Sequence, residues 1–186
     1  TFITVAFTGF VAAQQNRVDS IVAVLQKIDV SKAVDTTLFS SLNKILLEIT
    51  LDDAAVASLE KASEKLLVGN NIYWNYLVRR SIMNSLTVTD KAKAIAYGKR
   101  TYESMLTGKT LLAINIRSYL LRQLRIPYRT SVMLDDGFAY FNEKLKAFQL
   151  KNDSLGLADC YYVLGGFYRT KGLMTQAIYN MKKSVS

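Results

Sequence analysis

Apolar residues recur at spacings of three and four along most of the chain, and short polar segments separate the stretches that show this pattern. This is the period at which side chains share one face of an α-helix. Asp35, Asp52 or Asp53, Thr89 and Asn152-Asp153 stand before such stretches as candidate N-caps, and Pro127 suits a first helical turn. The pattern predicts an all-α chain of one domain. The expected helices cover about 17–28, 35–49, 53–68, 72–86, 90–106, 109–125 and 127–151, with two more beginning after Asp153 and at Leu173.

The last thirty residues show the clearest pattern. Leu157, Tyr161, Leu164 and Tyr168 form one stripe of a helix, and Ala177, Ile178, Met181 and Val185 are expected on the inner face of the next helix. Gly165 and Gly166 stand mid-helix, where each costs about 1 kcal/mol relative to Ala, so we expect a partner helix to approach closely there. Gly172 is expected to end the first helix with a positive φ.

This segment resembles a tetratricopeptide (TPR) repeat, a helix-turn-helix unit with a large residue, a Leu-Gly pair, a Tyr, a turn Gly and small residues at set offsets. Two departures are a Tyr where Trp is commoner and a Ser in place of the second Ala. The positions that carry the resemblance are Tyr161, Leu164, Gly165, Tyr168, Gly172, Ala177 and Ser184.

Earlier helices share a template with the last one, in which a small residue opens, an aliphatic residue follows and a small residue closes. It fits the segments that begin at Ala55, Ala94 and Ala177, and the first of these closes at Ala62. The resemblance implies a TPR-like solenoid of about four repeats with an extra N-terminal helix, at about 35–68, 71–107, 109–151 and 153–186. A chance likeness of the first two pairs is the alternative.

Charge and composition narrow the function classes. The chain has 24 Lys+Arg against 15 Asp+Glu, a net charge of +9, with no His and a single Cys. A basic balance suits nucleic acid, a membrane surface or an acidic peptide, and equally a merely solvated surface. No basic run exceeds a pair and no nucleic-acid motif is present, so nucleic acid is not expected. Without His, imidazole catalysis and His ligation are excluded, and Cys160, beside an apolar stripe, is expected to be structural.

Two short motifs contain residues that could support nucleotide or metal binding. Thr107-Gly-Lys-Thr110 resembles the end of a phosphate-binding loop, but Glu103 stands where that loop needs its first Gly, and helix precedes it instead of a strand. Asp135-Asp136-Gly137 lacks calcium-loop spacing and fits a solvated helix face. We therefore expect a chain without catalysis, cofactor or metal.

Residues 1–15 are apolar and uncharged, and the chain turns polar at Asn16. Such a stretch is too short to span a bilayer and is typical of a signal peptide, with Val11-Ala-Ala13 offering small residues for cleavage. The expectation is an exported protein whose TPR-like domain covers 16–186. A buried first strand or helix is the alternative.

The segment from Lys151 to Ala158, leading into the last repeat, resembles the exported TPR-like sensor region of Bacteroidetes-type sensor histidine kinases. The resemblance implies two-component signalling from the periplasm or cell envelope. It also implies a membrane tether, with membrane and kinase parts lying beyond this chain.

The TPR resemblance also implies a peptide-binding surface, because the first helix of each repeat lines the concave face of such arrays. Arginine forks suit the carboxylates of an acidic protein or peptide. Three arginines at these positions would form a basic ladder with tyrosines between, unless they are simply solvated. The candidate binding residues are Arg79, Asn115, Tyr119, Arg122, Tyr162 and Arg169. A scaffold or homodimerising module without a ligand is the alternative function.

Overall fold

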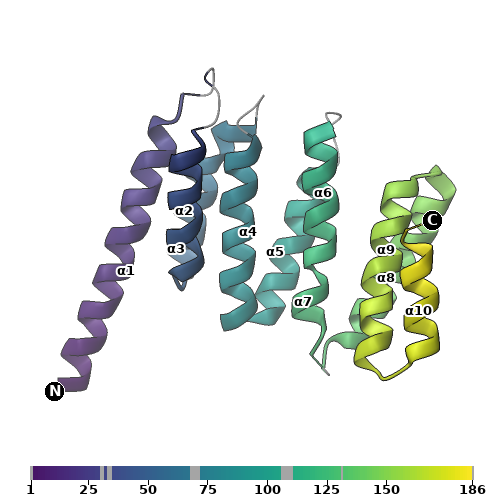
Figure 1. Cartoon of the computed structure of the whole chain (residues 1–186). Helices are drawn as coiled ribbons and strands as arrows, with labels where there is room; N and C mark the ends of the chain where they lie inside the picture. The colour runs from purple at the N-terminus through teal and green to yellow at the C-terminus, as the bar shows by residue number, and fades with distance from the viewer. Residues whose placement is uncertain are drawn as a thin grey trace. The chain divides into compact units, whose positions relative to one another are not determined.

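The computed structural model describes residues 2–29, 32, 35–67, 72–105, 111–130 and 132–185. Every element in these ranges is a helix and none is a strand, which confirms the all-α prediction (Figure 1). Packing divides the chain into two compact units, residues 1–89 and 90–186. These are called the first unit and the second unit below, and each is described by itself.

The first unit is built around α4, which packs against α2, α3 and the short η1, while α1 packs against α3. Its core is aliphatic around the fully buried Trp74, whose ring lies 5.4 Å from that of Phe39. The predicted cap Asp35 is confirmed, since its side chain accepts hydrogen bonds from the first turn of α2. Of the two candidates for α3, Asp52 is the cap, because its side chain accepts a hydrogen bond from the Ala55 amide. The helices are α1 (Phe2–Lys27), α2 (Thr36–Glu48), α3 (Asp53–Ser63), η1 (Glu64–Leu67) and α4 (Ile72–Thr89).

Helix α1 begins earlier than the sequence pattern predicted. It is continuous from Phe2 to Lys27, so helical backbone runs through the expected boundary at residues 15–16. The side chains of residues 2–13 lie outside what the structure describes, and the signal peptide stays a prediction. Within the described part of the chain, no helix has the length and apolar character needed to cross a membrane.

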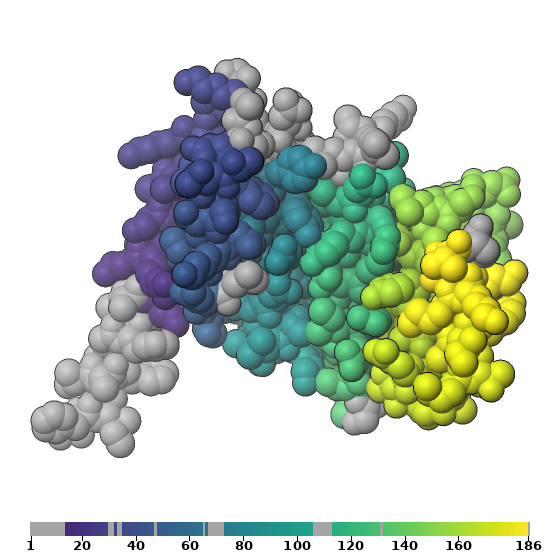
Figure 2. Space-filling model, viewed as in Figure 1, coloured from purple at the N-terminus to yellow at the C-terminus, as the bar shows by residue number. Residues whose placement is uncertain are grey.

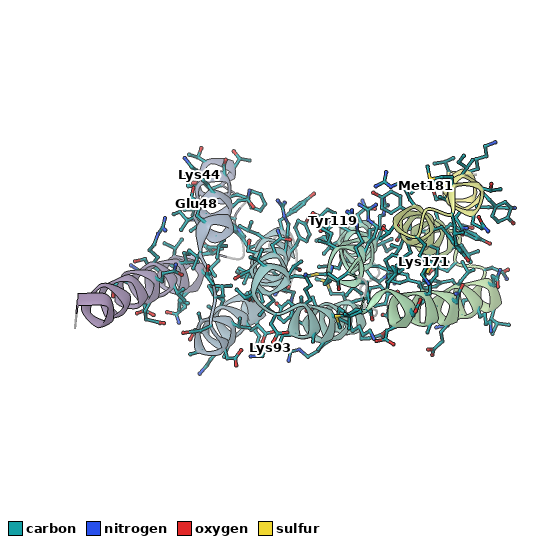
Figure 3. All side chains as sticks on the ribbon, turned by 90° about the horizontal axis from the view of Figure 1, so that it is seen from below. Lys44, Glu48, Lys93, Tyr119, Lys171 and Met181 are labelled. Carbon is teal, nitrogen blue, oxygen red and sulfur yellow. The ribbon has the colours of Figure 1, made fainter. Side chains whose placement is uncertain are left out.

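The second unit is arranged around α9, which packs against α6, α8 and α10, while α6 also packs against α5. Seen from below, α9 lies between α8 and α10 (Figure 3). Asp153 caps α9 as predicted, but Asp90 and not Thr89 caps α5, because the Asp90 carboxylate reaches the Lys93 amide. The helices are α5 (Lys91–Ser104), α6 (Leu111–Gln123), α7 (Arg125–Tyr128), α8 (Leu134–Lys151), α9 (Ser154–Thr170) and α10 (Met174–Lys183).

The single helix predicted from Pro127 to Lys151 is wrong, because the chain turns between α7 and α8. This turn brings Tyr128 into an aromatic core, where its ring lies 6.2 Å from Phe167 and 6.3 Å from Phe141. Gly137 leaves room for that cluster, since a Cβ there would lie 2.9 Å from Phe167 Cε2. Apolar periodicity continues across the turn and so conceals it.

The close approach predicted at the mid-helix glycines of α9 has two different sources. A Cβ at Gly165 would lie 3.0 Å from Met181 Cγ and 3.3 Å from the Ala177 oxygen, so α10 does approach there. Gly166 instead faces Arg125, whose Cδ would lie 2.7 Å from such a Cβ. The positive φ predicted for Gly172 is confirmed at 75°.

The other residues expected to pack the repeats are mostly buried. Leu164 is buried, whereas Tyr161 and Tyr168 are half-buried. The inner face expected for α10 is wrong in part, because 53% of Ile178 and 86% of Val185 are exposed. Buried small residues are Ala55, Ala62, Ala94 and Ala177.

Candidate peptide-binding face

The predicted binding residues fall in both units. Arg79 lies on α4 of the first unit, and the others lie on α6 and α9 of the second. On α6, Asn115 is exposed and Tyr119, which is labelled in Figure 3, is half-buried. Arg169 is exposed near the end of α9 and lines a groove along α10. Within the second unit, the structure brings Arg122 and Tyr162 of the expected ladder together.

Arg79 was expected on an exposed surface but is buried, with 8% of the residue accessible. Its Nε donates to Asn75 Oδ1 at 2.7 Å, and Asn75 Nδ2 donates to the Ser63 carbonyl at 2.9 Å. The arginine thus supports a contact between α4 and the end of α3. Its position corrects the predicted role, because the guanidinium completes a buried polar network.

Arg122 is held by an ion pair that the sequence did not indicate. Its Nε donates to Asp159 Oδ1 at 2.6 Å and its Nη2 donates to Ser118 Oγ at 3.1 Å. The side chain of Asp159 is 3% exposed, while that of Arg122 is 45% exposed. Burial raises the pKa of Asp159, and the Ser118 hydrogen bond and the Arg122 charge partly oppose this increase. The pair fixes the guanidinium of Arg122 at the surface between α6 and α9.

Tyr162 lies beside two guanidinium groups. The Cζ of Arg122 is 5.7 Å and that of Arg125 is 5.0 Å from the centre of its ring. Both distances fall in the range of cation–π interaction. We call Arg122, Arg125 and Tyr162 the arginine–tyrosine face.

Arg125 is the site residue that sequence reasoning missed. Its side chain lies against Gly166, and its Nε is buried without a hydrogen-bond partner among the described residues. Gly166 was the available signal, because a second mid-helix Gly requires a second close neighbour. The pattern could not show that this neighbour is a side chain from α7 and not the partner helix.

Charge is divided unequally between the units. Residues 1–89 hold 8 Lys+Arg and 8 Asp+Glu, whereas residues 90–186 hold 16 Lys+Arg and 7 Asp+Glu. The whole net charge of +9 therefore belongs to the second unit, which also carries the arginine–tyrosine face. Such an excess attracts anionic partners over distances of about 10 Å at moderate salt.

The second unit also contains a cysteine and two tyrosines whose pKa values are raised by burial. Cys160 is fully buried, and burial raises the pKa of its thiol to about 12, which leaves little thiolate near neutral pH. Burial likewise raises the pKa of Tyr102 and Tyr140. Across the residues that the structure describes, no cluster of Cys, Asp and Glu could hold a metal ion. The arginine–tyrosine face therefore consists of two cationic side chains beside an aromatic ring.

Comparison of the chain with protein-family models, with curated proteins and with solved structures finds no match.

Proposed function

We propose that this chain is a non-catalytic helical module that binds an acidic protein or peptide segment at the arginine–tyrosine face of its second unit. The observation that carries the proposal is the position of Arg125. Its buried Nε has no hydrogen-bond partner among the described residues, and its guanidinium lies beside Tyr162 in a unit of net charge +9. An unpaired buried donor is costly, and a carboxylate from a partner would pair with the charge of this guanidinium.

The ion pair between Arg122 and Asp159 orients the second guanidinium of this face. Asp159 offsets part of the positive charge of Arg122. It also holds the guanidinium of Arg122 beside the ring of Tyr162, where the arginine side chain is partly exposed and the Asp159 side chain is buried. A ligand carboxylate would meet a guanidinium that is already ordered, so little side-chain entropy is lost on binding. Tyr162 would pack against the aliphatic part of the ligand.

The wider setting of this binding module is part of the proposal. We propose TPR-like repeats, supported by the α9/α10 hairpin with Gly165 at its close approach and Gly172 at its turn. On the resemblance of residues 151–158 alone, we propose the exported sensory region of a two-component sensor kinase. The complete open reading frame tests this setting, since a membrane span and kinase core encoded in the same frame are expected.

Fluorescence anisotropy with two short labelled peptides tests the binding face. One peptide carries Glu at every second position and the other carries Gln at the same positions. We expect the Glu peptide to bind more tightly, and Arg125→Met to weaken it about tenfold, the effect of losing one hydrogen bond to a charged group. Arg129→Met, at an exposed turn residue, removes the same charge and is the control.

A second variant separates position from charge. Gly166→Ala leaves the net charge unchanged but displaces Arg125, whose Cδ would lie only 2.7 Å from the new methyl carbon. It should weaken the Glu peptide while far-UV circular dichroism stays unchanged. Equal loss in Arg125→Met and Arg129→Met would reject the face, and tighter binding of an oligonucleotide of equal charge would assign the surface to nucleic acid.

A further inference from the structure

Helix α10 presents an apolar surface that no described element covers. Its inner side, with Ala177 and Asn180, is buried, and Gly165 of α9 lies against Met181 and Ala177. Its outer side faces the viewer in the space-filling view (Figure 2). Large apolar residues there are between 41 and 86% exposed, namely Leu173, Met174, Ile178, Tyr179 and Val185.

Part of this surface is hollowed into a groove of about 440 Å³, which we call the α10 groove. Its apolar lining includes Met174, Ile178, Met181 and Val185, at successive spacings of four, three and four. This is one straight row along a helix, the arrangement that accepts the apolar face of a second helix. Two Met side chains make the row adaptable to the shape of a partner.

Charge around the groove selects the partner. The two polar residues that line it, among those described, are Arg169 and Lys182, and Lys183 lies next to them in sequence. The sequence from Cys160 to Ser186 contains no Asp or Glu at all. Two copies joined symmetrically through this face would bring these cations together with no acid of the segment to neutralise them. These cations would attract an acidic partner, whereas they would repel the same cations of a second copy.

We propose that the α10 groove docks an acidic amphipathic helix of a partner protein, with apolar side chains in the row from Met174 to Val185 and carboxylates at Arg169 and Lys182. Since α10 has 10 residues and a helix rises 1.5 Å per residue, the docked segment spans about three turns. This surface is separate from the arginine–tyrosine face and does not depend on its function.

The probe is a labelled Ala-based helical peptide with Leu at one face and Glu along both flanks, together with a matched peptide carrying Gln in place of Glu. Binding is followed by anisotropy at low and high salt. Ile178→Ser should weaken the Glu peptide about tenfold, because a buried Ile contact is lost. Lys182→Glu should weaken it several-fold, and more strongly at low salt.

Matched controls lie on α8. Leu150→Ser removes another exposed aliphatic residue, and Lys146→Glu makes the same change in net charge. Both should leave binding within twofold of the unchanged chain. Arg125→Met should also leave this peptide bound, so a failure of the arginine–tyrosine face and a failure of the α10 groove give different results.

Three results would overturn the proposal. Equal affinity for the Glu and Gln peptides would remove the argument from charge, and unchanged binding by Ile178→Ser would place the peptide elsewhere. A concentration-dependent dimer in sedimentation velocity that Ile178→Ser abolishes would make the face a contact between copies. Far-UV circular dichroism confirms in each case that the variant is folded.

Discussion

Arg79 of the first unit and Arg122 of the second stand in the same local pattern, each three residues after a Tyr on an α-helix. Each also donates to the polar side chain four residues before it, Asn75 for the former and Ser118 for the latter. Yet Arg79 is buried and the side chain of Arg122 is 45% exposed. Helical spacing explains the shared contact, and the neighbouring elements explain the difference.

The two arginines have different roles because their neighbours in the other helices differ. Asn75 links Arg79 to the end of α3, in a unit whose charges balance. Asp159 of α9 accepts a hydrogen bond from Arg122, in a unit that holds the whole net charge of the chain. A buried polar network stabilises the first unit, whereas the second unit uses a buried carboxylate to position a surface cation.

The largest expected effect tests whether the units can be compared as separate bodies. Phe167→Ala should lower the free energy of unfolding by about 3–5 kcal/mol, because a fully buried ring in the aromatic core of the second unit is lost. Urea unfolding followed by circular dichroism measures this change. The fluorescence of Trp74, the single Trp of the chain, reports on the first unit and should shift less.

Leu150→Ala, at a residue 87% exposed on α8, is the control and should stay within about 0.5 kcal/mol. Equal shifts of the fluorescence and circular dichroism transitions would show that the units unfold together. The contrast between them would then be one of surface chemistry only.

The sequence predicted the structure best at positions where a residue is energetically unfavourable or acts only within its own helical turn. Gly165 is unfavourable in a helix unless something lies close to it, and Met181 does. Asp35, Asp52 and Asp153 were found as caps because a side chain reaches only its own next turn. The all-α fold followed from periodicity in the same way.

Periodicity failed where the outcome depended on distant neighbours. It identified the apolar face of α10, but whether another element covers Ile178 is decided outside that helix. It treated Arg79 and Arg122 as equivalent, because neither Ser63 nor Asp159 is near them in sequence. Arg125 escaped for the same reason, since its contact with Gly166 spans two helices.

The next effect addresses the arginine of the first unit. Arg79→Ala should destabilise the chain by about 1–3 kcal/mol, because Asn75 Oδ1 loses its donor in a buried site. Trp74 fluorescence during urea unfolding measures the change. Arg129→Ala, at an exposed position, should cost no more than about 0.5 kcal/mol. A similar small cost for Arg79 would mean that the two arginines are alike after all.

The smallest effect concerns Asp159, the carboxyl group that accepts a hydrogen bond from Arg122. Because burial raises the pKa of Asp159 in the folded chain, the folded state holds its proton more strongly than the unfolded state. Stability from this group is therefore fully present below the unfolded pKa and is lost as the pH rises through the folded value. Asp159→Asn removes the titration but keeps an oxygen that can accept from Arg122. The variant should gain stability relative to the unchanged chain as the pH rises above about 4, as measured by urea unfolding over a range of pH that begins below this value. A relative loss over the same range would show that pairing with Arg122 outweighs burial, so that Asp159 stabilises the second unit as well as positioning its surface cation.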